Sequence, residues 1–148
     1  MSEHKATLSW KKNNPDFTYK TYDRTHSVKF GGGTEIQASS APEYLGKKEL
    51  VNPEEALAFS VASCHLLTFL AIASMSNYVV EEYEDEARAI LEKNKEGKMA
   101  ITKIYLRPKV KFGGTNIPDQ EKLTKLHEKA HKECFIANSI LSEVIVES

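Results

Sequence analysis

The sequence predicts an α+β fold, because the spacing of its hydrophobic residues alternates between the period of strands and the period of helices. Short alternating segments precede Asn52, and a nearly uncharged stretch typical of a helix follows it. A long alternating segment then leads to a second, amphipathic helical pattern. The predicted order is therefore strands, helix, strands, helix and strand, in one domain over residues 1–148.

Composition limits the functions that this chain can have. It has 148 residues, of which 41% are hydrophobic and 28% charged, with a net charge of -1. Such a chain can bury a core without disulfide bonds, and it lacks the positive charge that favours a nucleic-acid partner. Two cysteines are too few for a secreted disulfide framework, and the first residues lack the apolar run of a signal peptide. We therefore expect a cytoplasmic protein, in which a disulfide would be transient and redox-active.

The N-terminal part predicts a β-meander. Aromatic and β-branched residues recur in four short segments, and turn residues separate them at Asn13-Asn14-Pro15 and at the triplet Gly31-Gly32-Gly33. A loop is expected from Leu45 to Val51. The four predicted segments are Ala6 to Trp10, Phe17 to Tyr22, Val28 to Phe30 and Thr34 to Ala38.

The next segment predicts a central helix that is buried on all sides. From Ala56 to Met75 only His65 can carry a charge, and about 20 apolar residues is the length of a membrane span. Polar residues such as Ser63 and Thr68 are spread around this stretch, however, and no Lys/Arg anchor follows it. This pattern favours a helix in a protein core over a helix in a membrane.

Four residues, Asn52 to Glu55, open this helix. The Asn52 side chain can accept a hydrogen bond from a free amide, Pro53 suits the first helical position, and Glu55 completes a capping box. Capping does not require Glu54, although a carboxylate is favourable anywhere in the first turn of a helix.

The second half begins with antiparallel strands. Tyr78 to Tyr83 is expected to be extended, whereas the propensities of Glu84 to Lys93 leave helix and strand open. Met99 to Phe112 alternates throughout, so we expect one long half-buried strand. Pro108 should mark a sheet edge or a bulge in it.

The C-terminal part predicts a second helix and a last strand. Pro118 opens the helix, and apolar residues at helical spacing, including Ala130 and Cys134, mark its inward face. Leu141 to Val146 alternates again and should form a strand. Cys134 thus ends an amphipathic helix, whereas Cys64 lies about three turns into an apolar one.

The residues around the two cysteines form recognisable motifs. The first motif is Asn52 to Leu57 followed by Ala62 to His65, and the second is Ala130 to Ile136. Further matching segments are Tyr22 to His26, Ser40 to Gly46 and Ile101 to Ile104. Together these motifs resemble the OsmC family, named for osmotically inducible protein C, over most of the chain. The resemblance implies an OsmC-like fold and an intertwined homodimer with active sites at the subunit interface.

The resemblance also implies a thiol-dependent peroxidase, related to organic hydroperoxide resistance proteins. Cys64 would attack the terminal oxygen of an organic hydroperoxide and become a sulfenic acid, and Cys134 would condense with it to a disulfide. A dithiol reductant would then restore both thiols. Apolar residues such as Phe59, Leu67 and Phe135 would suit bulky hydroperoxides better than hydrogen peroxide. We expect no cofactor, no metal and no membrane partner.

Two activating residues follow from the same resemblance. Burial raises the pKa of a thiol, so a nearby cation must favour the thiolate, and in the family an arginine held by a glutamate does this. Glu54 matches the glutamate. Residues 40–50 contain Lys47 and Lys48 but no arginine, so Arg24 in the N-terminal strands is the candidate for the cation.

Helix geometry limits what Glu54 can do. Ten residues of a straight helix carry it about 15 Å along the axis from Cys64 and roughly 80° around it. Either the helix is broken between them, or a second subunit completes the site. We expect a homodimer with composite sites, because a small chain with so apolar a helix gains burial from a partner.

Two other interpretations remain open. His127, His131 and Cys134 recur on the second helix, and with Cys64 and His65 they could form a Cys/His metal site. The two cysteines could also be small core residues of a non-catalytic ligand-binding or scaffold domain, since buried free cysteines are common.

Overall fold

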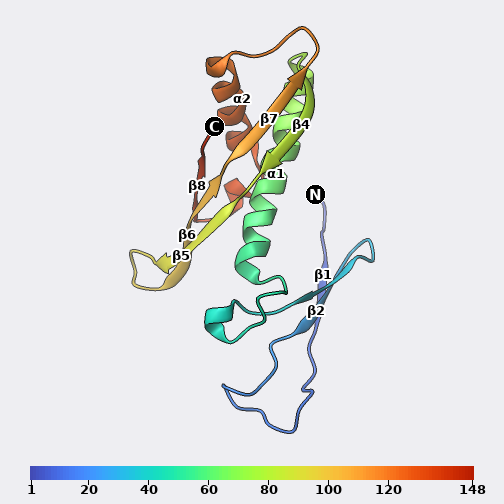
Figure 1. Ribbon diagram of the computed structural model, residues 1–148, viewed down its shortest axis with the longest axis vertical. Coiled ribbons are helices and arrows are strands. Elements are labelled where there is room, and N and C mark those ends of the chain that lie inside the picture. Colours follow the sequence, from blue (N-terminus) through green and yellow to red (C-terminus); the bar gives the residue numbers. More distant parts are fainter. The chain divides into compact units, whose positions relative to one another are not determined.

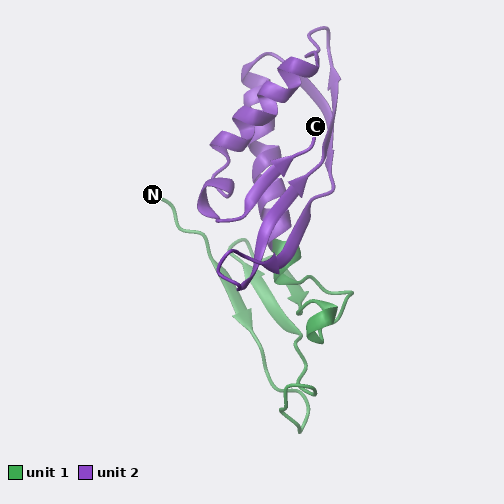
Figure 2. Cartoon of the chain, turned by 90° about the vertical axis from the view of Figure 1, so that its left-hand side faces the viewer, with its two compact units in different colours: residues 1–56 green, residues 57–148 purple.

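The chain folds into two compact units, residues 1–56 and residues 57–148 (Figure 2). The structure is a computed structural model that describes all 148 residues. It contains two α-helices and eight β-strands, so the α+β class predicted from the sequence is confirmed. The single domain expected over residues 1–148 stays a prediction.

The first unit holds the predicted β-meander. Strands β1 (Ala6–Ser9), β2 (His26–Phe30) and β3 (Glu35–Ala38) form an antiparallel sheet in that order (Figure 1). The glycine triplet closes the β2–β3 hairpin, where Gly33 has a φ of 96°, a conformation that favours glycine. A short 3-10 helix, Pro42–Tyr44, leads into the predicted loop.

The aromatic segment Phe17 to Tyr22 forms a turn, and the strand predicted there was wrong. The carbonyl oxygen of Thr18 accepts hydrogen bonds from the amides of residues three and four positions later, each at 3.1 Å. The rings of Phe17, Tyr22 and Trp10 contact one another, with centroids between 5.2 and 6.4 Å apart. These aromatic residues therefore pack as a cluster on a turn, where ring contacts replace strand pairing.

Helix α1 (Pro53–Met75) begins at the predicted capping box. The Asn52 side chain accepts a hydrogen bond from the Glu55 amide at 2.8 Å, and the Glu55 carboxylate accepts one from the Asn52 amide at 3.1 Å. The helix is unbroken over its 23 residues. It ends just before Asn77, which adopts a left-handed conformation with a φ of 63°.

Helix α1 buries only one face within the chain. Val61, His65, Phe69 and Ala73 are almost completely buried, whereas Phe59 is 67% exposed. By length and composition alone the helix could cross a membrane, and 33% of its apolar window is buried inside the chain. The prediction of burial on all sides therefore holds for one face only, because the other elements of the second unit cover one side.

Two small sheets pack beside α1 in the second unit. Strand β4 (Val79–Asp85) pairs with β7 (Pro108–Gly113), and β5 (Arg88–Lys93) pairs with β6 (Met99–Leu106), both antiparallel. The last strand, β8 (Glu143–Val146), lies parallel to β6. The segment from Glu84 to Lys93 that propensity left open is thus extended: it ends β4 at Asp85 and forms β5 from Arg88 onward, because pairing with β7 and β6 decides its conformation.

The single long strand predicted from Met99 to Phe112 was wrong, because the chain forms two strands in different sheets. The break falls at Arg107, whose amide donates to Asp85 Oδ1 at 2.7 Å instead of to a neighbouring strand. Pro108 has no amide hydrogen, so it cannot continue the β6 ladder and begins β7 instead.

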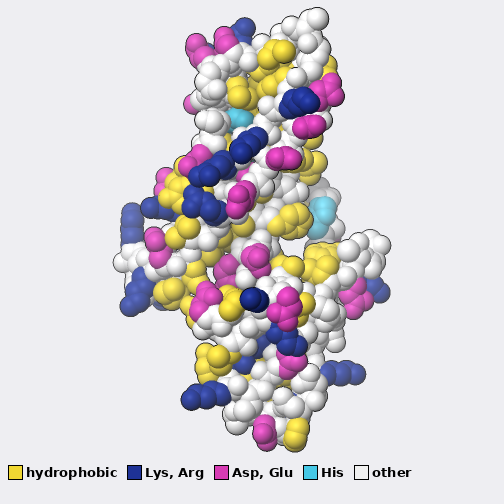
Figure 3. Space-filling model, in the orientation of Figure 1, with side chains coloured by type: hydrophobic (Ala, Val, Ile, Leu, Met, Phe, Trp, Pro, Cys, Tyr) yellow, Lys and Arg dark blue, Asp and Glu magenta, His cyan; other side chains and the backbone are white.

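Opposite charges face each other across the β4–β7 pair. Glu82 lies opposite Lys111 and Glu84 lies opposite Lys109. Lys111 Nζ is 3.9 Å from Glu82 Oε1. Figure 3 shows this row of basic side chains beside acidic ones on the outer face of the strands. Such cross-strand pairs support the strand pairing and leave the apolar face of the sheet for the helices.

Helix α2 (Gln120–Glu133) packs against α1 (Figures 1 and 2). Its N-cap is Asp119, whose side chain accepts a hydrogen bond from the Lys122 amide at 2.9 Å. Apolar side chains of both helices share one core cluster, whose buried members are Phe69, Ile72, Ala73, Leu126 and Ala130. This packing carries the C-terminal end of α2 to the middle of α1.

Candidate functional site

The packing of α2 against α1 brings the two cysteines together. Cys64 lies about three turns into α1, and Cys134 caps the C-terminal end of α2. Both are free thiols, and the Cys134 thiol lies within hydrogen-bonding reach of the Cys64 sulfur. The two residues that the sequence predicted to act together are therefore neighbours in the second unit.

The two thiols differ in their access to solvent. Cys64 is half-buried and lines an apolar cavity of about 310 Å³, whereas Cys134 is only 1% exposed. The other residues that line this cavity are Phe59, Ser60, Ser63, Leu67, Thr68, Phe135 and Ile136. A small molecule in this cavity can therefore reach Cys64, while Cys134 lies behind it in the core.

Hydrogen-bond donors favour the thiolate of Cys64. Burial by itself raises the pKa of this thiol, but the backbone amides of Ile136 and Phe135 donate towards the sulfur, and so does the Cys134 thiol. Their combined effect holds the pKa of Cys64 below its ordinary value. The Thr68 hydroxyl lies beside them and donates to the Cys64 carbonyl oxygen at 2.8 Å.

The pKa of Cys134 shifts in the opposite direction. Burial and its contact with Cys64 raise the pKa of Cys134 to about 11, although the Ala137 amide donates to its sulfur at 3.4 Å. Of the two thiols, Cys64 is therefore the one that loses its proton first, and Cys134 keeps its proton. This asymmetry agrees with an attacking thiolate at Cys64 and a protonated thiol behind it.

Sequence reasoning missed the amides that surround the sulfurs. The amides of Phe135, Ile136 and Ala137 follow directly after α2, and together they donate to both cysteines. Every residue except proline has a backbone amide, so no residue type in the sequence could have predicted these donors. Only the closeness of this segment to the second cysteine was visible in the sequence.

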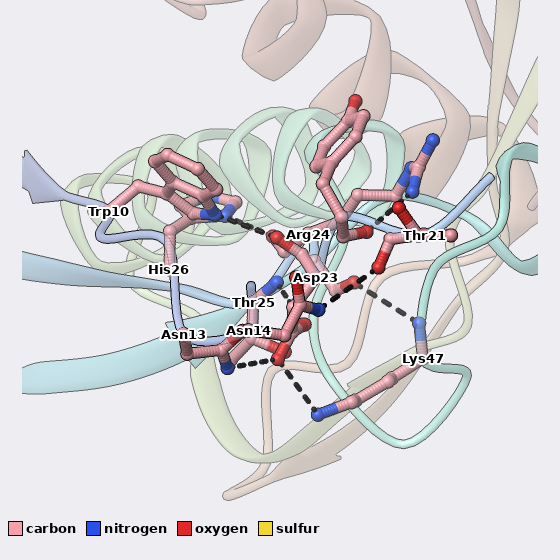
Figure 4. A network of polar contacts seen from close by, with 11 residues as sticks. Trp10, Asn13, Asn14, Thr21, Asp23, Arg24, Thr25, His26 and Lys47 are labelled. Atoms are coloured by element: carbon pink, nitrogen blue, oxygen red, sulfur yellow. Dashed lines mark hydrogen bonds and ion pairs between the residues drawn. The ribbon is translucent and has the colours of Figure 1, made fainter. Parts of the chain in front are cut away.

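Arg24 lies in the first unit and binds backbone there. Its guanidinium donates to the carbonyl oxygens of Tyr22 at 2.8 Å and Tyr19 at 2.6 Å, and it lies 3.8 Å from the centre of the Tyr22 ring. The neighbouring Asp23 gathers a polar network that includes Asn13 and is drawn in Figure 4. Within this chain Arg24 holds the aromatic turn, and its role as the activating cation stays a prediction.

Glu54 forms no ion pair, and its Oε2 atom is buried without a hydrogen-bond partner. It does not hold Arg24, whose donors point to backbone carbonyls. Because α1 is unbroken, its ten intervening residues keep Glu54 about 15 Å from Cys64 along the helix axis. A broken helix is therefore ruled out as the way in which Glu54 could serve the cysteine of its own chain.

A buried pair of histidines lies between α1 and α2. His65 Nε2 and His127 Nδ1 are 3.0 Å apart, and both side chains are almost completely buried. Burial lowers the pKa of His127 to about 4, and burial together with repulsion from protonated His127 and His131 lowers the pKa of His65 to about 4. Both rings are therefore neutral at physiological pH.

The metal-site interpretation finds no set of ligands here. On α2, His127 faces His65 and Cys134 faces Cys64, so the side chains that share this helix face point to different partners. No three His, Cys, Asp or Glu side chains in residues 1–148 lie close enough together to hold a metal ion.

Comparisons with known proteins identify relatives of this chain. The family model described as OsmC-like protein matches residues 46–148. The uncharacterized protein YmaD of Bacillus subtilis is 31% identical over 114 residues, which are 76% of this chain and 75% of YmaD. The structure of an OsmC-like protein of unknown function from Vibrio cholerae is 45% identical, with a TM-score of 0.95 over 99% of both chains.

More distant structures share the fold. The organic hydroperoxide resistance protein OhrB of Bacillus subtilis has a TM-score of 0.70 at 20% identity, over 98% of this chain and 96% of OhrB. At this level of identity the likeness concerns the fold alone, and it confirms the OsmC-like architecture that the sequence predicted.

Acid should destabilise the protein through the histidine pair. Each imidazole binds a proton near pH 6.5 when unfolded but only near pH 4 when folded, so the unfolded state binds more protons between these values. Stability should therefore fall as the pH decreases through this window. The variant His127→Asn removes one of the titrating groups, and this should abolish up to roughly 3 kcal/mol of the acid-induced loss.

Urea unfolding of both proteins, at neutral pH and near pH 4, measures this difference. If the wild type and His127→Asn lose the same stability on acidification, the imidazole of His127 does not resist protonation in the folded state.

Proposed function

Because the chain belongs to the family of OsmC-like proteins, which includes organic hydroperoxide resistance proteins, we propose that it is a cysteine-based peroxidase that reduces organic hydroperoxides to alcohols. One observation carries this proposal. Cys64, with a lowered pKa, lines an apolar cavity and lies within hydrogen-bonding reach of the buried Cys134, whose pKa is raised. A reachable thiolate backed by a second thiol is the arrangement that a two-cysteine peroxidase requires.

In the first step the Cys64 thiolate attacks the terminal oxygen of the hydroperoxide. A sulfur–oxygen bond forms while the oxygen–oxygen bond breaks, so Cys64 is oxidised to a sulfenic acid and the peroxide is reduced. The departing alkoxide takes a proton from water and leaves as an alcohol. The amides of Phe135 and Ile136 hold the thiolate in place for this attack.

In the second step the Cys134 sulfur attacks the sulfenic acid at Cys64. A sulfur–sulfur bond forms, the sulfur–oxygen bond breaks, and the leaving hydroxide takes the Cys134 proton and departs as water. The burial of Cys134 suits this role, because peroxide cannot reach and oxidise this thiol before it reacts with the sulfenic acid. A dithiol reductant then exchanges with the disulfide and restores both thiols.

The cavity also suggests the class of hydroperoxide. Its wall next to Cys64 is formed by apolar side chains such as Phe59, Leu67 and Phe135, and no charged residue lines it. Apolar surface favours an alkyl or aryl substituent through burial. Hydrogen peroxide gains nothing from such a wall, so we infer that organic hydroperoxides are the preferred substrates.

A homodimer in the cytoplasm completes this proposal. Phe59, Leu67 and Met75 expose large apolar surfaces along α1, which a second copy of the chain would cover. The Oε2 atom of Glu54 is also buried without a hydrogen-bond donor from its own chain, and a second subunit could supply one. We infer that Glu54 and Arg24 act at Cys64 of the other subunit, and a fully active monomer would contradict this.

A mass measurement separates a peroxidase from a scaffold with buried cysteines. Stoichiometric organic hydroperoxide should remove two hydrogens from the reduced wild-type protein, because a disulfide closes between Cys64 and Cys134. The variant Cys64→Ser should not react, and Cys134→Ser should stop at a sulfenic acid that a dione reagent captures. An unchanged wild-type mass favours the scaffold, and zinc in the native mass favours the metal site.

Substrate preference is tested at the cavity wall. Phe135→Ala removes apolar contact with the substituent of an organic hydroperoxide and should lower kcat/KM for it about tenfold, while the rate with hydrogen peroxide changes little. Stopped-flow oxidation of Cys64 by both peroxides gives this ratio, and Leu141→Ala, at a fully exposed residue that does not line the cavity, is the control. Equal losses with both peroxides would mean that Phe135 does not select the substrate.

A further inference from the structure

The buried histidine pair lies beside the cysteine pair and has no part in the proposed chemistry. His65 directly follows Cys64 on α1, and His127 precedes Cys134 by seven residues on α2. Seven residues are two helical turns, so His127 and Cys134 project from the same face of α2. Apart from the thiol contact itself, the bond between His65 and His127 is the one side-chain hydrogen bond that joins the two helices.

The hydrogen bond orients both rings, and a second contact holds His127. The two nitrogens lie 3.0 Å apart and the ring planes differ by only 9°, so the bond lies nearly in the plane of both rings. His127 also stacks on Phe69, with centroids 4.4 Å apart and planes 25° apart. A neutral imidazole offers one donor and one acceptor, so the bond forms only when both rings take matching tautomers.

Apolar packing alone would not fix how α2 lies along α1. Contacts of residues such as Leu126 and Ala130 are non-directional, and a small slide or rotation of the helix costs them little. A buried hydrogen bond is different, because any slide leaves two imidazoles without partners in the core. In coiled coils, for example, a single buried polar residue fixes the register of the helices.

We propose that His65 and His127 are positioning residues that set the approach of the Cys134 sulfur to Cys64 and thereby the ease with which the disulfide closes. The link runs through the two helices, since each histidine shares a helix with one of the cysteines. The biological meaning of this inference rests on the proposed peroxidase function, but the disulfide equilibrium itself requires no hydroperoxide.

The test is the equilibrium of the full-length protein with reduced and oxidised dithiothreitol. The two thiols of Cys64 and Cys134 lose two electrons and two protons to oxidised dithiothreitol, whose ring disulfide opens to a dithiol. Acid quenching, alkylation of free thiols and intact mass give the equilibrium constant. His127→Leu should lower this constant about tenfold, whereas His127→Asn, with an amide near the Nδ1 position, should stay within about twofold of the wild type.

A second pair of variants keeps the test decisive if His127→Leu does not fold. His65→Gln carries its amide to the Nε2 position and should retain the equilibrium constant, whereas the shorter His65→Asn cannot reach His127 and should lose about tenfold. Both replacements are amides of similar polarity. Their difference therefore reports on the hydrogen bond alone.

Ile72→Val is the matched control for general loss of packing. It removes a buried methylene from the same helix interface, so it should lower stability to urea while leaving the dithiothreitol equilibrium unchanged. Equal constants for the wild type, His127→Leu and His65→Asn would overturn the proposal, and so would an equal fall in the Ile72→Val control.

A protein that closes its disulfide as expected with dithiothreitol but not with hydroperoxide would refute the peroxidase function alone.

Discussion

The contact between Cys64 and Cys134 exists only because α2 packs against α1, and most of the structure serves that packing. Phe69, Ile72 and Ala130 form the apolar part of the interface, and the β4–β7 pair covers its other side. The histidine pair adds a directional bond between the same two helices, next to Cys64 on α1 and two turns before Cys134 on α2. A second peroxide molecule can also react with the sulfenic acid at Cys64. The Cys134 thiol competes better with that reaction when the fold already holds it close to Cys64.

The two sulfurs also show how one local environment produces two different thiols. Three consecutive amides after α2 surround the pair, but Cys64 receives more donors and faces the cavity, while Cys134 is enclosed in the core. Burial therefore dominates at Cys134 and hydrogen bonding dominates at Cys64. Within the second unit the thiolate is favoured without any arginine or lysine, so a cation such as Arg24 would add to an activation already present.

The sequence predicted most elements where pattern and chemistry agree, as in the capping box at Asn52 and the amphipathic face that ends at Cys134. It erred where tertiary pairing decides: the aromatic run from Phe17 became a turn, and the alternation through Pro108 concealed a change of sheet. The cysteine pair followed from motif resemblance. The amides around it and the His65–His127 bond depend on contacts between distant segments, which spacing along one chain does not contain.

The structure predicts that Cys64 ionises before Cys134, which keeps its proton. Titration of the reduced protein, followed by the ultraviolet absorbance of the thiolate, tests it most directly. The wild type should show one ionisation below the ordinary pKa of a cysteine thiol, which disappears in Cys64→Ser, and a second near 11. If the lower ionisation instead survives in Cys64→Ser and is lost in Cys134→Ser, Cys134 is the attacking thiol and Cys64 the resolving one.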